Sequence, residues 1–382
     1  MKNIGIIGCG DISDTYIKSQ KYFNNINFVS CADINLDAAT KTSKKHNITL
    51  SSVDEIILDD NIDIILNLTN PQAHYDVTKK ALEKDKHVYC EKPMSVKFKD
   101  ARELLDLANR KNLYLGNAPD TFLGGGGQKS REIIDSNFVG DILTGNFVFA
   151  FPGVQDFHSN PESWFQEGGG PVIDMGPYFF TTLVNLLGSA KNVRGRGVKF
   201  FKTRKYKAGA NKGKTFEVTV PTSYDFSIEF KCSAIIQGFL SFDVLNHKRN
   251  HMELYGTSGS IIVPDPNMFG GPVLFSKGLG SSWEEISVEN KPLGKINIVN
   301  KRGNTNEDAN QANYRGIGLS EMIDSMESNR KHRCNGELSL HVLDIIECIM
   351  LSSSKKTEIN LRTSCPKPDP IDDNYLTKLL KN

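Results

Sequence analysis

The segment KNIGIIGCGDIS, residues 2–13, decides how the rest of the chain is interpreted. An apolar run rich in β-branched residues leads directly into Gly8, Cys9 and Gly10, and residues 11–23 then show a helix-like pattern. A second apolar run, residues 28–32, ends at Asp33. Strand, glycine turn, helix, strand and acid in this order are typical of a βαβ unit that binds a dinucleotide.

Each part of this unit has a physical role in holding a dinucleotide. Gly8 allows the tight turn, and Gly10 lets a pyrophosphate approach the backbone because glycine has no Cβ atom. The amides of Asp11 and Ile12 open the helix and face the phosphates at the positive end of its dipole. Asp33 is placed to accept hydrogen bonds from a ribose diol. A purely structural turn is the alternative, since glycines also mark ordinary turns.

Two further positions refine this prediction. Ser13 stands where the pattern has a third glycine, and serine is a small enough change for helix and strand still to pack. The carboxylate of Asp33 suits a free 2′-hydroxyl and repels a 2′-phosphate, and Ile34 and Asn35 follow it in place of an arginine. The sequence therefore predicts NAD(H) as the cofactor, in preference to NADP(H).

Composition bounds the class of protein. The 382 residues are 38% hydrophobic and 24% charged with a net charge of +1, which allows two domains and gives no general case for nucleic acid or membrane partners. No apolar run approaches the ~20 residues of a membrane span. The first strand begins too close to Met1 to leave room for a signal peptide. Seven cysteines without a CxxC pair indicate free thiols and a cytoplasmic location.

Strands and helices alternate through the first third of the chain, which predicts an α/β, doubly wound domain over residues 1–118. A four-glycine loop at 124–127 and a helix at 128–137 follow it. Residues 119–382 are then predicted to form a second, α+β domain with a mostly antiparallel sheet. Its strand-like runs are residues 142–151, 224–230, 234–244 and 252–255.

Several candidate site residues follow predicted strands, at the edge where parallel sheets bind ligands. Those after the strand at 62–68 and at the end of the strand near 113–116 are Thr69, Asn70, Pro71 and Asn117. Lys92 follows the strand at 87–90, and Pro93 holds its backbone extended, so its side chain should point into the crevice. Taken alone, Lys92 is more simply a surface lysine.

Three segments together resemble the Gfo/Idh/MocA family, the glucose–fructose oxidoreductase and inositol dehydrogenase family. They are GIIGCGDIS at 5–13, DKHVYCEKPMS at 85–95 and GGGPVIDMGPY at 168–178. The resemblance runs from residue 3 to about 260 with the same order and spacing. It implies a Rossmann domain, an open-faced sheet domain that packs against another copy in a homodimer or homotetramer, and oxidation of a sugar or polyol.

The resemblance also implies roles for individual residues. It puts Lys92 beside the nicotinamide and the reacting carbon, makes Glu91 a cofactor-binding residue, and makes Asp174 and Tyr178 the matching residues of the glycine-rich segment. It makes His74 a cofactor-side histidine, although a residue of the first helical turn is an equally simple reading. His158 and Trp164 precede the glycine-rich segment and are expected to wall the substrate pocket.

Alcohol oxidation requires a base, because a proton leaves the oxygen as the hydride leaves the carbon. A phenol has an ordinary pKa of about 10 and becomes a useful base when a nearby ammonium lowers it. We therefore predict Tyr178 as proton acceptor, Lys92 as its electrostatic partner or as an alternative acid or base, and Asp174 as the residue that orients the substrate. Helical spacing should put Asp174 and Tyr178 on one face. A half-buried aromatic with a satisfied hydroxyl is the alternative for Tyr178.

The remaining signals favour a neutral substrate. The family often has paired arginines where this chain reads NAPDTF, residues 117–122, so a sugar or polyol is favoured over a phosphate or carboxylate.

His247 and His251 lie beside strand runs with no third ligand, so no metal is predicted. The basic stretch 199–214 indicates a solvated hairpin or loop more than nucleic-acid binding. Rival functions are NAD-dependent glycoside cleavage with transient redox, and a non-catalytic nucleotide sensor.

Overall fold

The computed structural model describes residues 1–297 and 313–381, and within this part the chain forms two compact units. The first unit comprises Met1–Leu123, Asn313–Leu343 and Ile371–Asn382, and the second comprises Gly124–Ala312 and Asp344–Pro370. The sequence predicted one division at residue 118. The structure instead includes two late segments of the chain in the first unit.

The first unit is built on a six-stranded sheet in which every neighbouring pair is parallel. Its strand order, β3-β2-β1-β4-β5-β6, confirms the doubly wound α/β fold predicted from the alternating pattern. The strands are β1 (Lys2–Ile7), β2 (Ile26–Ala32), β3 (Thr49–Leu50), β4 (Ile64–Asn67), β5 (His87–Cys90) and β6 (Leu115–Asn117). The helices between them are α1 (Asp11–Ser19), α2 (Leu36–His46), α3 (Val53–Leu58), α4 (His74–Glu83) and α5 (Phe98–Arg110), with short 3₁₀ turns at Gln20–Tyr22 and Thr121–Leu123.

The central strands of this sheet are covered on both faces. All four residues of β4 are completely buried, including Asn67 at its end, as the nearly continuous apolar run predicts for a parallel strand between two helical layers. Apolar residues of α3, α4 and α5 pack with β1, β4 and β5 in one hydrophobic cluster. The sheet is therefore a fixed platform, and the loops at the carboxyl ends of its strands present the polar groups.

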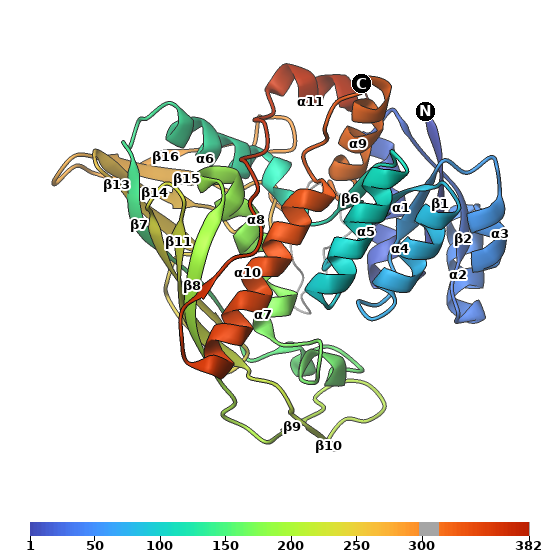
Figure 1. The fold of residues 1–382 in the computed structure, drawn as a ribbon, viewed down its shortest axis with the longest axis horizontal. Helices are drawn as coiled ribbons and strands as arrows, with labels where there is room; N and C mark the ends of the chain where they lie inside the picture. Colours follow the sequence, from blue (N-terminus) through green and yellow to red (C-terminus); the bar gives the residue numbers. More distant parts are fainter. Residues whose placement is uncertain (298–312, 382) are drawn as a thin grey trace. The chain divides into compact units, whose positions relative to one another are not determined.

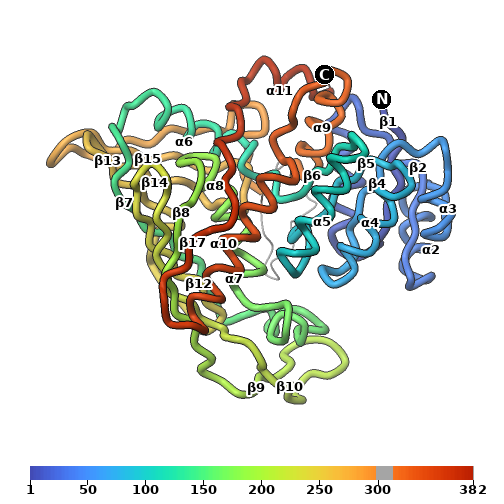
Figure 2. The backbone as a smooth tube through the Cα atoms, in the orientation of Figure 1, coloured from blue at the N-terminus to red at the C-terminus, as the bar shows by residue number. Residues whose placement is uncertain are grey.

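Two helices that come late in the chain complete the first unit. They are α9 (Ile317–Glu327) and α11 (Asp373–Leu379). The Asn25 side chain donates to the Ser320 carbonyl at 2.8 Å, which attaches α9 beside β2. The Lys381 amide donates to the Tyr22 carbonyl at 2.8 Å, so the C-terminal end of the chain, marked C in Figure 2, lies next to the 3₁₀ turn Gln20–Tyr22. Helix α10 (Gly336–Lys355) contains the point at which the chain passes from the first unit to the second.

The second unit contains a nine-stranded sheet in the order β16-β15-β14-β13-β7-β12-β11-β8-β17 (Figure 1). Its neighbouring strands are antiparallel except for β7 and β12, which confirms the mostly antiparallel sheet expected. The strands are β7 (Ile142–Ala150), β8 (Ala190–Val198), β11 (Ser223–Phe230), β12 (Ile235–Ser241), β13 (Met252–Gly256), β14 (Gly259–Val263), β15 (Val273–Lys277), β16 (Glu284–Ile286) and β17 (Ile359–Asn360). The basic stretch forms a separate hairpin, β9 (Thr203–Lys205) with β10 (Thr215–Glu217), as predicted.

Helix α8 (Gly176–Leu187) is the centre of the second unit's core. All twelve of its residues are buried, as expected for a helix composed mainly of apolar residues. Phe179 stacks on Phe147 of β7 with ring centroids 4.9 Å apart, and Phe180 meets Phe226 of β11 edge-on at 5.8 Å. Because aromatic pairs of this kind add to the burial of apolar area, they fix α8 against the sheet.

The predicted glycine loop at 124–127 is wrong in part, because helix α6 (Gly125–Asp135) begins inside it. A Cβ atom at Gly124 would lie 2.5 Å from the Cα atom of Phe269, and one at Gly125 would lie 2.8 Å from the Cα atom of Gly294. The glycines are therefore required for close packing against neighbouring backbone, and the helix tolerates their low propensity.

Candidate functional site

The glycine turn after β1 is held tightly by the neighbouring strand ends. Gly8 has φ +105°, and a Cβ atom there would lie 2.5 Å from the backbone carbonyl of Leu68. The Gly8 amide donates to the Ala32 carbonyl and the Leu68 amide donates to the Ile7 carbonyl, both at 2.8 Å. The fold itself therefore requires glycine at position 8.

Gly10 has a different reason to be glycine. A Cβ atom there would have no atom of the described residues within 4 Å, so the packing of the protein itself does not require glycine at position 10. Gly10 is the N-cap of α1, and among the described residues no side chain caps that helix. The open side of Gly10 and the first amides of α1, those of Asp11 and Ile12, form a cradle that fits the pyrophosphate of a dinucleotide.

Ser13 and Asp33 complete this cradle. The Ser13 hydroxyl donates to the Gly10 carbonyl at 2.7 Å, so the serine that replaces the third glycine is satisfied locally and buried. The Asp33 carboxylate accepts from the Cys9 amide at 2.7 Å and from the Asn35 amide at 2.8 Å. Asp33 thus fixes the glycine turn, and its half-exposed carboxylate retains lone pairs for a ribose hydroxyl.

Lys92 lies in a braced loop after β5. Lys92 is half-buried, and the preceding Glu91 is 7% exposed. The Asn117 side chain donates to the Cys90 carbonyl at 2.8 Å and to the Glu91 carbonyl at 3.0 Å, and its oxygen accepts from Ser339. All of these partners are groups of the protein itself. The side-chain amide of Asn117, a predicted site residue, therefore shapes the lysine loop.

His74 connects two loops at the same edge of the sheet. Its Nδ1 lies 2.6 Å from the Pro93 carbonyl oxygen and its Nε2 lies 2.9 Å from the Thr69 carbonyl oxygen. The ring is 1% exposed, and this burial lowers the pKa of His74 although both carbonyls oppose the shift. Both ring nitrogens therefore face backbone groups, and His74 ties the loop containing Thr69, Asn70 and Pro71 to the lysine loop.

Asp174 and Tyr178 lie in the second unit, on two consecutive helices. Asp174 ends α7 (Pro171–Asp174) and is half-buried, whereas Tyr178 lies in the first turn of α8 and is 6% exposed. The helix is interrupted at Met175, so the pair does not lie on one continuous helix, and the shared face stays a prediction. Pro177 has no amide hydrogen to continue the helix of α7, and it is well suited to the first turn of a new one.

The aromatic residues predicted to wall the pocket are joined to this segment. The rings of His158 and Trp164 are 4.5 Å apart between centroids. The Gly170 amide donates to the Trp164 carbonyl at 2.8 Å, and the Asp174 amide donates to the Gly170 carbonyl at 3.0 Å. Two successive backbone hydrogen bonds therefore connect Trp164 to Asp174 within the second unit.

One polar contact of the lysine loop was not predicted. The hydroxyl of Tyr16, on α1, donates to Glu91 at 3.0 Å, and Tyr16 is 0% exposed. A tyrosine inside an amphipathic helix is typical of a core residue, so no sequence signal indicated its partner.

Among the described residues no three His, Cys, Asp or Glu side chains cluster in the way a metal ion needs, and no helix has the length and apolarity to cross a membrane.

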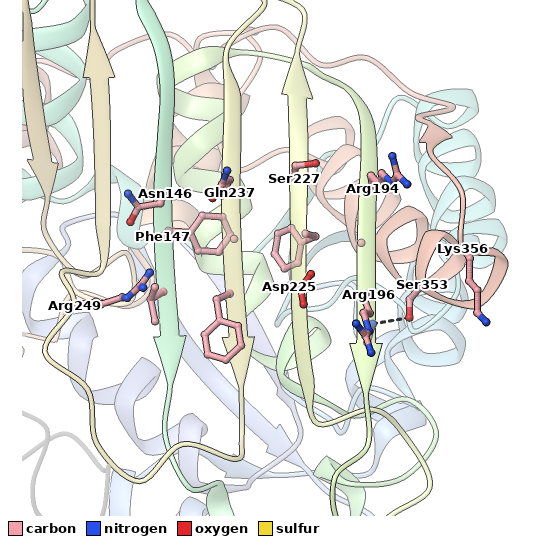
Figure 3. A pocket seen from close by; sticks show the side chains of 16 residues that line it. Asn146, Phe147, Arg194, Arg196, Asp225, Ser227, Gln237, Arg249, Ser353 and Lys356 are labelled. Carbon is pink, nitrogen blue, oxygen red and sulfur yellow. Dashed lines mark hydrogen bonds between the residues drawn. The ribbon is translucent and has the colours of Figure 1, made fainter.

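A separate, shallow concavity of about 850 Å³ lies on the face of the nine-stranded sheet (Figure 3). Its centre has polar and aromatic side chains of β7, β11 and β12, among them Asn146, Ser227 and Gln237. The predicted catalytic and substrate residues do not line this concavity.

Two family models match the chain. Residues 2–118 match the model described as the oxidoreductase family, NAD-binding Rossmann fold, of Gfo/Idh/MocA. Residues 128–262 match the Gfo/Idh/MocA C-terminal domain. The two matches follow one another along the chain and together cover about two thirds of it.

Curated relatives with similar sequences are oxidoreductases. An uncharacterized oxidoreductase of Schizosaccharomyces pombe is 29% identical over 147 residues, 38% of this chain and 39% of the relative, so the chain spans about two fifths of that protein's length. The trans-1,2-dihydrobenzene-1,2-diol dehydrogenase of Xenopus tropicalis is 25% identical over 74% of this chain and 87% of its own length. The D-xylose dehydrogenase of Paenarthrobacter nicotinovorans is 25% identical over 58% of this chain and 59% of its own length.

A solved structure with the same fold is levoglucosan dehydrogenase in complex with NADH and L-sorbose. It matches with a TM-score of 0.79 and 17% identity, over 95% of this chain and 99% of that one. At this identity the match establishes the fold, a Rossmann domain joined to an open sheet.

The two glycines of the turn should separate stability from cofactor binding. Gly8→Ala should lower the thermal unfolding temperature, because the positive φ and the contact with Leu68 leave no room for a Cβ atom. Gly10→Ala should leave that temperature unchanged and raise the Kd for NADH about tenfold, or ~1.4 kcal/mol. Scanning fluorimetry and NADH fluorescence titration measure the two effects. Unchanged NADH affinity in Gly10→Ala would contradict the cradle.

Proposed function

The chain belongs to the Gfo/Idh/MocA family of oxidoreductases, and we propose that it transfers a hydride between NAD and a hydroxyl-bearing carbon of a sugar, a polyol or a close derivative. The observation that carries this proposal is the braced lysine loop: Lys92 follows β5 at the sheet edge that also presents the glycine cradle. The names of two relatives support alcohol oxidation, since one is a dehydrogenase of a diol and the other of xylose.

Asp33 supports NAD over NADP. Its carboxylate is held at the glycine turn by the Cys9 amide, where a 2′-phosphate would meet a like charge. The following residues, Ile34 and Asn35, provide no cation to neutralise that phosphate, and the Asn35 amide is itself bonded to Asp33.

The chain's own residues handle the proton of the reaction. Bound NAD would supply the carbon that accepts the hydride. Tyr178 takes the proton of the reacting hydroxyl, and the ammonium of Lys92 stabilises the negative charge that develops on oxygen. Asp174 accepts a hydrogen bond from the substrate and so orients it. In an alternative assignment Lys92 transfers the proton and Tyr178 orients the hydroxyl.

The surroundings of these residues favour a neutral, hydroxyl-rich substrate. Residues 117–122 contain no basic side chain, and their one acid, Asp120, is 0% exposed and accepts from the Gly316 and Gly318 amides. The adjacent rings of His158 and Trp164 provide an aromatic surface for the apolar face of a sugar ring. His74, Glu91 and Asn117 act on the cofactor side by holding the two loops.

Glycoside cleavage with transient redox is the second candidate, because the same groups could remove and return a hydride within one turnover. It predicts product formation without net NADH. A non-catalytic nucleotide sensor is the third candidate, and it predicts NADH binding without turnover of any sugar.

The open sheet face favours a homo-oligomer, a homodimer or homotetramer. The concavity presents Arg194, Arg196 and Arg249, with Arg196 paired to Asp225 across neighbouring strands, and the aromatic ring of Phe239, which is a mixture suited to a protein surface (Figure 3). All seven cysteines are free thiols, which supports a reducing, cytoplasmic location.

Tyr178→Phe should abolish most turnover without weakening the binding of NADH. We expect kcat to fall about 100-fold or more, because general-base catalysis contributes on that scale, while the Kd for NADH stays within about twofold. The assay is NADH formation with NAD⁺ and a panel of neutral sugars and polyols, chosen first by thermal shift. Tyr224→Phe removes a buried phenol of the same unit and is the matched control. Equal turnover in the two variants would remove Tyr178 from the mechanism.

The wild-type protein should use NAD⁺ with a KM at least about tenfold below that for NADP⁺, which corresponds to ~1.4 kcal/mol. Asp33→Asn keeps an oxygen for the Cys9 amide and removes the charge, so it should bring the KM values for NAD⁺ and NADP⁺ closer together. Steady-state kinetics with both cofactors tests the expectation. A preference of the wild type for NADP⁺ would refute it.

Light scattering after size exclusion should give two or four times the mass of one chain. Phe239→Lys replaces an aromatic ring of the concavity by a charged group that would have to lose water in an interface, and this cost should shift the protein toward monomers. A wild-type protein that is monomeric at micromolar concentration would contradict the homo-oligomer.

A further inference from the structure

We propose that Tyr16 and Glu91 form a positioning pair that fixes the backbone of Lys92 relative to α1, the helix whose first amides face the dinucleotide. This inference rests on the proposed function and deepens it. Neither side chain touches the reacting atoms: the pair acts through Lys92.

The Glu91 carboxylate is held by protein donors on both of its oxygens. Oε1 accepts from the Tyr16 hydroxyl at 3.0 Å, and Oε2 accepts from the Lys92 amide at 2.9 Å. The guanidinium of Arg315 lies 4.0 Å from Oε1. The carboxylate therefore connects α1 directly to the peptide that carries the lysine, and its orientation sets that of the Lys92 backbone.

Tyr16 is suited to act as a fixed donor. It is 0% exposed, and burial, followed by the charges of Glu91 and Asp120, raises its pKa well above the ordinary value. Its phenol is consequently neutral and donates a hydrogen bond to the carboxylate. Hydrogen bonds to a charged acceptor in a buried site are among the stronger ones in proteins.

The acids around this pair make the hydroxyl of Tyr16 important. Asp120 is a second carboxyl group with 0% exposure, and burial raises its pKa, while Arg315 favours its charged form. The guanidinium of Arg315 thus acts on both of these buried acids. Removing the Tyr16 donor leaves Glu91 with the Lys92 amide and a guanidinium that Asp120 also attracts, so the carboxylate should lose its fixed orientation.

A second brace holds the other end of the lysine loop. His74 contacts the Pro93 carbonyl at 2.6 Å and the Thr69 carbonyl at 2.9 Å. Lys92 is therefore flanked by Glu91, tied to the cofactor helix, and by Pro93, tied to the loop after β4. Each of these two connections joins the lysine loop to an element that the cofactor is expected to contact. The first is made by a carboxylate and a phenol, and the second by an imidazole ring.

The test compares Tyr16→Phe with Tyr89→Phe in the full-length protein. Both tyrosines are completely buried in the first unit, and each substitution removes one hydroxyl, but among the described residues only Tyr16 is hydrogen-bonded to Glu91. Three quantities are measured: the Kd for NADH, the rate at which acetic anhydride labels Lys92 with and without NADH, followed by peptide mass spectrometry, and kcat for the sugar found active.

Tyr16→Phe should bind NADH within about twofold of the wild type but lose most of the protection of Lys92 by NADH. Its kcat should fall about tenfold or more with little change in the sugar KM, because a displaced catalytic group costs rate more than binding. Glu91→Gln, which changes charge and hydrogen bonding but not shape, should move protection and kcat in the same direction. Tyr89→Phe should match the wild type in all three.

The outcomes separate this inference from the proposed function. Protection and kcat in Tyr16→Phe equal to those in Tyr89→Phe would overturn the positioning pair. A wild-type protein that binds NADH without protecting Lys92, or that oxidises no sugar or polyol, would instead count against the proposed role of Lys92. If Tyr16→Phe unfolds below the temperature of Tyr89→Phe, the Glu91→Gln variant decides, and wild-type protection and kcat in it would overturn the pair.

Discussion

The geometry of the first unit depends on a contact between the ends of two strands. A Cβ atom at Gly8 would lie 2.5 Å from the Leu68 carbonyl, so the chain leaving β1 passes directly against the chain leaving β4. This contact fixes where the turn enters α1, and therefore where Tyr16 meets Glu91. The cofactor cradle and the lysine loop are thus set by the same backbone packing, and a small shift of the turn would change both.

What could be predicted from the sequence was encoded locally. The glycine turn, the helix after it and Asp33 follow one another within a short stretch, and hydrogen bonds between neighbouring strand ends are enough to assemble them. The return of α9 and α11 to the first unit could not be predicted in this way, because it depends on contacts such as that of Asn25 with Ser320, almost 300 residues apart in the chain. The strand and helix rhythm that indicated a division at 118 carries no information about such contacts.

The errors around the second unit have two different causes. Gly124 and Gly125 were interpreted as loop residues, whereas tertiary packing against Phe269 and Gly294 requires them in and before a helix. The interruption between Asp174 and Tyr178 did have a local signal, since Pro177 cannot donate the hydrogen bond that a continuous helix needs. The helical spacing used for this pair did not take that proline into account. Glu91 and Asn117 were recognised as residues of the site, but only the structure shows their polar groups bonded to protein, because the sequence does not reveal which way a side chain at a strand end points.

The difference between local sequence signals and contacts from distant residues also applies to the charge of the substrate. The absence of arginine from residues 117–122 indicated a neutral substrate, yet Arg315, distant in sequence, has its guanidinium 4.0 Å from Glu91 in the first unit. That arginine is 8% exposed, and it stabilises the charged forms of buried acids, as the direction of its effect on Asp120 indicates. Arg315 therefore acts on acids that belong to the protein itself. A cation near the lysine loop does not by itself indicate an acidic substrate, because the charge of a site depends on which acids face its cations as well as on how many arginines the chain contains.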